Sequence, residues 1–209
     1  MAGKNRESAR KSVFREYAEA IIVALILALI IRTFVVQAFK IPSSSMEPTL
    51  EVGDHLLVSK FIYGVRNPFT GEVWIDIRDP RRYDVVVFRY PRDPRQDYIK
   101  RVIGLPGETV EIRDKTVYID GRRVDDPRAV FRDDEILPPS RQPRDNFGPM
   151  TVGPDELFVM GDNRDNSHDS RYWGMVDQGD LRGKAFILYW SWDQEEIGVR
   201  WNRLGQRIE

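Results

Sequence analysis

The sequence contains no cysteine and only two histidines, His55 and His168. The lack of cysteine excludes disulfides, thiolate catalysis and cysteine-ligated metal sites. The sequence also has no excess of one charge, because its 32 basic and 33 acidic residues give a formal net charge of −1. That balance gives no electrostatic reason to expect nucleic-acid binding. The 209 residues, 41% of them hydrophobic, suit one folded domain with an appendage.

The appendage is predicted at the amino terminus, where basic residues precede an apolar stretch. Residues 20–31 are uncharged, Arg32 interrupts, and the apolar pattern resumes to Phe39. With the Arg32 side chain reaching toward the interface, residues 16–39 provide the roughly 20 residues that a membrane span needs. The basic residues in front favour a cytoplasmic amino terminus. We therefore expect a cytoplasmic basic tail at 1–15, a transmembrane anchor at 16–39 and an extracytoplasmic domain at 40–209.

Two other interpretations of the apolar stretch remain open. It can be a cleavable signal peptide, because Val36-Gln37-Ala38 offers small residues at suitable spacing. It can also be the buried core helix of a soluble protein. The intact mass of the mature protein separates the first from a retained anchor.

Beyond residue 50 the pattern is that of short β-strands separated by turns. Runs rich in β-branched and aromatic residues occur at 54–63, 83–90, 96–103, 109–113, 116–120, 156–160 and 184–192. Asp120-Gly121 predicts a tight hairpin turn. Residues 125–149 are proline-rich and charged, which predicts an inserted surface loop. The fold class expected is mainly β, an antiparallel sheet domain on a single membrane helix.

Three consecutive serines, Ser43-Ser44-Ser45, follow the apolar stretch directly. Ser44 and Glu47 have capping-box spacing, but Pro48 disfavours a helix there. A serine nucleophile needs a base for its proton and donors for the developing oxyanion. A histidine base has only two candidates, of which His55 lies in a predicted strand and His168 in a polar loop.

Lysine is the other candidate base. Its ordinary pKa of about 10.4 must be lowered, as burial among apolar groups can do. Strand alternation places Lys100 on the face opposite Ile99 and Arg101. A solvated lysine at a strand edge is the competing interpretation.

The stretch 161–171, Gly-Asp-Asn-Arg-Asp-Asn-Ser-His-Asp-Ser-Arg, is crowded with hydrogen-bonding groups. A calcium loop beginning at Asp165 is disfavoured, because its sixth position is Ser170 rather than glycine and its twelfth is Val176 rather than glutamate. The stretch is either a plain polar turn or a support for a nearby site.

Four stretches in this order, 42–50, 83–90, 98–107 and 161–171, resemble the type I signal (leader) peptidases, membrane-bound serine proteases with a Ser-Lys dyad. The resemblance implies a signal-peptidase-like β fold, shared with self-cleaving repressor-type proteases, and no metal or cofactor. It implies Ser45 as nucleophile, Lys100 as general base and the Ser43 hydroxyl as an oxyanion donor beside the Ser45 N–H. Supporting residues by resemblance are Ser167, Asp169, Arg171 and Asp162, and substrate-pocket candidates are Phe39, Ile41, Met46 and Ile99.

The resemblance also implies the partners and the location. The expected substrates are exported preproteins with small residues at the first and third positions before the cut. The expected location is the bacterial inner membrane, with the catalytic domain outside the cytoplasm. Interfacial tryptophans often contact lipid, which makes Trp190, Trp192 and Trp201 candidates for seating the domain on the bilayer.

Two alternatives to the signal-peptidase interpretation are open. A repressor-type protease would cleave only its own chain, although no DNA-binding region is evident. A membrane-tethered binding module would bind a preprotein without turnover. A preprotein cleavage assay distinguishes all three.

Overall fold

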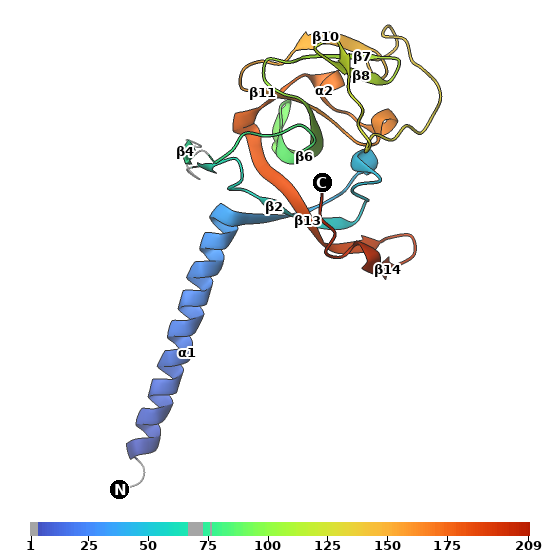
Figure 1. The fold of residues 1–209 in the computed structure, drawn as a ribbon. Coiled ribbons are helices and arrows are strands. Elements are labelled where there is room, and N and C mark those ends of the chain that lie inside the picture. The colour runs from blue at the N-terminus through green and yellow to red at the C-terminus, as the bar shows by residue number, and fades with distance from the viewer. Residues whose placement is uncertain (1–3, 67–72, 76) are drawn as a thin grey trace.

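The computed structural model describes residues 4–66, 73–75 and 77–209. A long helix, α1 (Lys4–Ile30), continues into a π-helical turn, η1 (Ile31–Val35), and projects away from the remaining domain (Figure 1). Within the described residues one helical stretch, Val13–Val35, is long and apolar enough to cross a bilayer, and none of its most apolar window is buried in the protein. That exposure argues against the soluble core helix.

The helical stretch ends at Val35, earlier than the predicted end at Phe39. Val36–Lys40 form strand β1, which pairs antiparallel with β2 (Asp54–Ser59) so that Val36 lies opposite Ser59. Residues after β2 satisfy carbonyls at the helix end: Lys60 N donates to Val35 O at 3.0 Å and Lys60 Nζ to Thr33 O at 2.6 Å. Pairing with a distant strand thus overrides the apolar pattern over 36–39.

The main sheet of the described chain has eight antiparallel strands, in the order β1-β2-β13-β5-β6-β11-β12 with β14 beside β13. Its further members are β5 (Val85–Tyr90), β6 (Asp93–Gly104), β11 (Glu156–Met160), β12 (Val176–Asp177), β13 (Leu181–Asp193) and β14 (Gly198–Val199). The prediction of a mainly β, antiparallel fold is confirmed.

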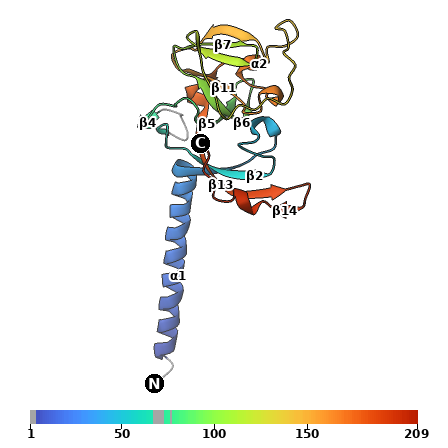
Figure 2. The same ribbon diagram turned by 45° about the vertical axis from the view of Figure 1, so that its right-hand side comes forward.

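A second antiparallel sheet lies on the far side of the main sheet from α1, in the order β10-β7-β8-β9 (Figures 1 and 2). Its strands are β7 (Thr109–Arg113), β8 (Thr116–Ile119), β9 (Arg122–Arg123) and β10 (Phe147–Thr151). The predicted turn is present, since Asp120 and Gly121 both have positive φ, 50° and 74°. A short hairpin of β3 (Val65–Arg66) and β4 (Val73–Ile75) stands apart.

Short helical turns connect the strands: η2 (Ser44–Met46), η3 (Arg164–Asn166), α2 (Ser170–Trp173), η4 (Gln178–Asp180) and η5 (Trp201–Arg203). Two of these turns, η2 and η3, contact each other. The serine stretch and the polar stretch 161–171 therefore meet in space, although more than 110 residues separate them in the chain.

Candidate active site

Ser45 lies in η2 and is held there by apolar neighbours. Met46 and Leu50 are fully buried, and the Leu50 N–H donates to the Met46 carbonyl at 2.9 Å. These anchors hold Ser45 at 9% exposure, where it lines a cleft. Because Ser45 is at the start of a helical turn, its N–H has no acceptor within that turn. The Ser45 hydroxyl and a backbone N–H donor are thus close together at this position.

Lys100 lies on β6 opposite Val86 and is 4% exposed. Its Nζ is 2.7 Å from Ser45 Oγ and 3.0 Å from the Ile99 carbonyl oxygen. Burial lowers the pKa of Lys100 from 10.5 to about 8, and the nearby carboxylates of Asp169 and Asp162 limit this fall. The arrangement can remove a proton from Ser45 at mildly alkaline pH.

Arg101, the next residue, points to the opposite face of β6 and is also buried. Its guanidinium binds both carboxylate oxygens of Asp162, at 2.8 and 2.7 Å. The Thr49 hydroxyl donates to the same carboxylate at 2.6 Å. Asp162 therefore ties the strand of Lys100 to the segment of Ser45. Sequence reasoning missed Arg101, whose signal was a second charge adjacent to Lys100 in an otherwise hydrophobic strand.

Asp169 and Arg171 form the second buried pair of the site. Arg171 Nη2 lies 2.8 Å from Asp169 Oδ2, and both residues are buried. Burial raises the pKa of Asp169, but the charge and hydrogen bonds of Arg171 outweigh this and hold it below its ordinary value. The Asp169 side chain also accepts from the Arg171 N–H at the start of α2 and from the Gly161 N–H at 3.1 Å. The Asp169 carboxylate therefore stays ionised beside Lys100.

Three further residues of the polar stretch position the serines and were not singled out from the sequence. The Asn163 N–H donates to the Ser45 carbonyl at 3.2 Å, and its Nδ2 donates to the Ser44 carbonyl at 3.1 Å. Asn166 Nδ2 donates to Ser44 Oγ at 2.9 Å. At Gly161 an added Cβ would lie 2.3 Å from the Ser45 carbonyl oxygen. Only glycine allows this approach of the two segments.

Ser43 and Ser167 line the same cleft as Ser45 and Lys100. Ser43 is exposed and its side chain makes no capping hydrogen bond. The Ser167 side chain is buried, and no hydrogen bond joins it to Lys100 in the described structure. Its hydroxyl lies toward Asp169 instead, where it helps to lower the pKa of that carboxyl. The oxyanion role of Ser43 and the supporting role of Ser167 stay predictions.

The cleft has a volume of about 680 Å³ and is lined by residues 42–45, 96–100, 165–168 and Tyr172. Of the four predicted pocket residues it contains Ile99. Ile41 and Met46 are buried in the core cluster behind the cleft, and Phe39 packs against that cluster. These three residues do not line the cleft here, because their apolar side chains pack in or against the core that holds η2, and their role in a substrate pocket stays a prediction. Tyr98 and Tyr172, which line the cleft, were not predicted.

Neither histidine hydrogen-bonds to Ser45 in the described structure. His55 packs edge-on against Tyr189 on β13, with ring centroids 5.9 Å apart. His168 lines the cleft but packs against Tyr172 at 5.1 Å. No group of three or more metal-ligating side chains occurs among the residues that the structure describes. Asp165, the first residue of the disfavoured calcium loop, is engaged by Lys115 instead.

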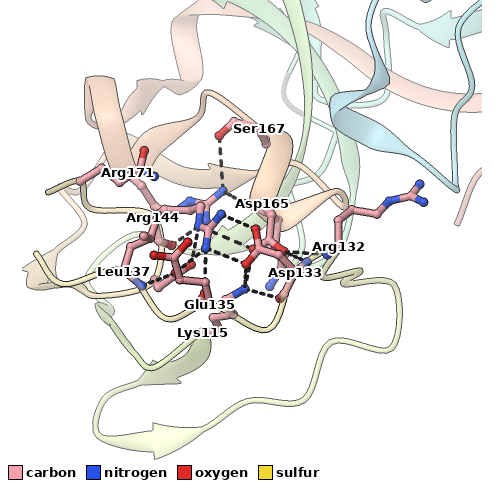
Figure 3. A network of polar contacts seen from close by, with 12 residues as sticks. Lys115, Arg132, Asp133, Glu135, Leu137, Arg144, Asp165, Ser167 and Arg171 are labelled. Atoms are coloured by element: carbon pink, nitrogen blue, oxygen red, sulfur yellow. Dashed lines mark hydrogen bonds and ion pairs between the residues drawn. The ribbon is translucent and has the colours of Figure 1, made fainter.

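The predicted surface loop 125–149 is bound to the site, and its last residues belong to β10. Figure 3 shows Arg144 and Lys115 surrounded by carboxylates of the loop and of the polar stretch. Arg144 binds Asp133 and Asp145 at 2.8 Å, and the Asp165 carboxylate accepts from the Asp133 N–H at 3.0 Å. The Arg144 carbonyl accepts from Arg171 Nη1 at 2.7 Å. The loop therefore buttresses the stretch that carries Asp169 and Arg171.

Comparison with known proteins identifies the family. A profile described as signal peptidase, peptidase S26, matches residues 14–190. Signal peptidase I of Pseudomonas fluorescens is 39% identical over 211 residues, 87% of this chain and 74% of the relative. Signal peptidase I of Pseudomonas aeruginosa is 40% identical, with the same coverage of both chains. A crystal structure of a signal peptidase I from Enterococcus faecalis is 35% identical, with a TM-score of 0.41, and covers 52% of this chain and 98% of that one. With a buried serine–lysine pair at its centre and a family match over most of its length, the chain belongs to the signal peptidase family, peptidase S26.

Proposed function

We propose that this chain removes signal peptides by acyl transfer, with Ser45 as nucleophile and Lys100 as general base. As a member of its family it is a membrane-anchored serine endopeptidase that cleaves signal peptides. The observation that carries the assignment of roles is the 2.7 Å distance between Lys100 Nζ and Ser45 Oγ within a buried site. That distance is within hydrogen-bond reach for direct proton transfer.

The proposed reaction has two halves. Neutral Lys100 Nζ takes the Ser45 hydroxyl proton while Oγ attacks the scissile carbonyl carbon, and the ammonium then protonates the departing amine. Water next attacks the acyl-enzyme as Lys100 again accepts a proton, which returns to Ser45 Oγ as the new carboxyl terminus leaves. The Ser45 N–H and the Ser43 hydroxyl are proposed to bind the oxyanion of each tetrahedral intermediate.

The substrate is proposed to lie extended in the cleft between η2 and β6. An extended peptide directs alternate side chains to one side, so the first and third residues before the cut face the same wall. Ile99 and the Ser45 segment limit the space at that wall, which supports a preference for small residues at both positions. The carboxylates of Asp169 and Asp162 are fully buried, so they do not contact the peptide in the cleft.

The enzyme is proposed to lie in the bacterial inner membrane with residues 1–15 in the cytoplasm and the β domain outside. Five basic residues before the apolar part of α1 support that orientation. Ser45 follows Val35 by ten residues, at most about 35 Å of extended chain, which keeps the site near the bilayer. Trp192 and Trp201 are exposed and Trp190 is half-buried, which supports the first two as lipid contacts.

A preprotein cleavage assay with the full chain in detergent micelles tests the roles. Ser45→Ala and Lys100→Ala are each expected to lower the rate by on the order of 10³-fold or more, since both act in the same step. His55→Ala and His168→Ala serve as controls and are expected to keep most activity. Cleavage by Ser45→Ala at the wild-type rate would refute the assignment. Binding without turnover would favour the binding module, and cleavage of its own chain alone the repressor-type protease.

A further inference from the structure

A second cavity lies on the side of the domain from which α1 leaves. Its volume is about 480 Å³, within the range of roughly 300–1,000 Å³ that small-molecule sites occupy. Its walls come from the end of β2, the middle of β13 and the carboxyl-terminal segment 207–209. In Figures 1 and 2, β2 and β13 run beside the domain end of α1, away from the second sheet.

The cavity is adjacent to the point where the chain emerges from its membrane-spanning helix. Ser59, which lines it, is paired with Val36, the first residue after the helical stretch. The following residue, Lys60, binds the carbonyls of Val35 and Thr33. With α1 across the bilayer, the mouth of the cavity is therefore near the headgroups.

The walls of the cavity are largely apolar. Four hydrophobic residues from three separate segments contribute to them: Ile62, Phe186, Ile187 and Ile208. Phe186 is 36% exposed although it lies in the middle of a strand of the main sheet. Exposed apolar surface beside a membrane is suited to contact with hydrocarbon, because burying it there removes it from water.

One polar group of the wall lacks a partner. Ser59 is 7% exposed, and its Oγ has no hydrogen-bond partner among the described residues. A buried hydroxyl without a partner costs free energy that a ligand oxygen at the same place would recover. Ser59 therefore marks where a hydrogen-bonding ligand is expected.

The charges around the cavity leave one positive group uncompensated. Lys184 Nζ is bound to Asp84 at 2.6 Å, and Glu209 is bound to Arg128 at 3.2 Å. The exposed Arg207 guanidinium has no hydrogen-bond or ion-pair partner within the described part of the chain. Guanidinium groups bind phosphate oxygens in paired, charge-assisted hydrogen bonds.

We propose that this cavity binds a membrane phospholipid with an anionic headgroup. An acyl chain lies against the apolar wall, and phosphate oxygens accept hydrogen bonds from Arg207 and Ser59. The proposal rests on α1 crossing the bilayer and is independent of the roles of Ser45 and Lys100. A bound lipid would connect β2 and β13, and with them β1 and the helix end, to the membrane surface.

Native mass spectrometry of the full chain in a neutral detergent tests the proposal, with phosphatidylglycerol and phosphatidylcholine of identical acyl chains as probes. The wild type is expected to bind phosphatidylglycerol at least fivefold more tightly. Arg207→Gln is expected to weaken this binding about fivefold, the typical effect of one basic residue at an anionic surface. Ser59→Ala is expected to weaken it as well. Arg122→Gln is the matched control, because it removes the same charge from an exposed position on β9, in the second sheet.

Each variant is first shown to cleave a preprotein in micelles at close to the wild-type rate, which establishes that it is folded. Equal binding of the two lipids by the wild type would overturn the proposal. So would an equal loss of binding in Arg207→Gln and Arg122→Gln, which would indicate a general charge effect. Displacement of the lipid by millimolar inorganic phosphate would identify a simple anion site instead. Loss of cleavage in Ser45→Ala has no bearing on these outcomes.

Discussion

Arg101 and Asp162 form a bidentate ion pair in the protein interior, with Nε 2.8 Å from Oδ1 and Nη2 2.7 Å from Oδ2. Both side chains are almost inaccessible to solvent. Arg101 follows Lys100, the proposed general base, and Asp162 lies in the polar stretch 161–171. The pair thus fixes Lys100 relative to that stretch from the opposite face of the same strand.

Removing one partner of this pair is expected to be strongly destabilising. Arg101→Met leaves the Asp162 carboxylate buried without its cation, which should lower the free energy of unfolding by about 3–5 kcal/mol. The double variant Arg101→Met/Asp162→Leu removes both charges and should recover much of this loss. Urea unfolding in micelles, followed by tryptophan fluorescence, measures both. Equal stability of the single and double variants would contradict this view of the pair.

The rate of cleavage is expected to rise with pH through the pKa of Lys100. Burial lowers that pKa to about 8, and only the neutral amine accepts the Ser45 proton. The kcat/KM of the wild type should therefore fall about tenfold for each pH unit well below 8 and level off above it. Lys100→Arg should be inactive throughout, because a guanidinium stays protonated. A rate that is independent of pH between 6 and 9 would exclude Lys100 as the base.

Lys100 is expected to lower the stability of the fold. Its pKa is about 8 when folded and 10.5 when unfolded, so the unfolded chain binds the proton more tightly. Below pH 8 this costs the folded state up to roughly 3 kcal/mol, and the cost vanishes as pH rises toward 10.5. Lys100→Met should thus be more stable than the wild type at pH 7 and lose this advantage near pH 10. Melting curves at both pH values check the trend, and an advantage equal at both would contradict it.

Glycine at position 161 is expected to be required for activity. In Gly161→Ala the new methyl group meets the Ser45 carbonyl oxygen and the Ser167 hydroxyl, each at 2.3 Å, so the two segments must separate. A displacement near 1 Å at a catalytic group can cost on the order of 10²-fold in kcat/KM. Gly198→Ala is the control, because its nearest contact would be 3.9 Å away. Steady-state kinetics on both variants test this, and full activity of Gly161→Ala would mean that the loop yields freely.

The loop 125–146 is expected to support the site through Arg144. Arg144→Gln leaves the buried Asp145 without its cation and loosens the contact with Asp133, which should cost about 2–3 kcal/mol and lower the cleavage rate. Arg141→Gln in the same loop breaks only an exposed pair with Glu135 and should change stability by less than about 1 kcal/mol. Unfolding curves and cleavage rates of the two variants are compared. Equal effects would show that the loop is not coupled to the site.

Local patterns in the chain were sufficient for the fold class. β-Branched and aromatic residues predict strands at 83–90 and 156–160, where the structure has β5 (Val85–Tyr90) and β11 (Glu156–Met160), and Asp120-Gly121 predicts the turn between β8 and β9. Turn chemistry and strand propensity act over a few residues, so they can be recognised without knowledge of the partner strand. The roles expected of Ser45 and Lys100 came instead from the resemblance of four stretches to the signal peptidases.

Tertiary pairing decided the remaining features. Ser45 and Lys100 are 55 residues apart, and their contact exists because η2 packs its apolar side chains behind β5 and β6. The same packing buries Ile41 and Met46 in the core. The pairing of β1 with β2 ends the helix at Val35. The loop that carries Arg144 contacts the polar stretch through the Asp165 carboxylate and Arg171. Each of these depends on contacts between segments distant in the chain, which no local pattern specifies.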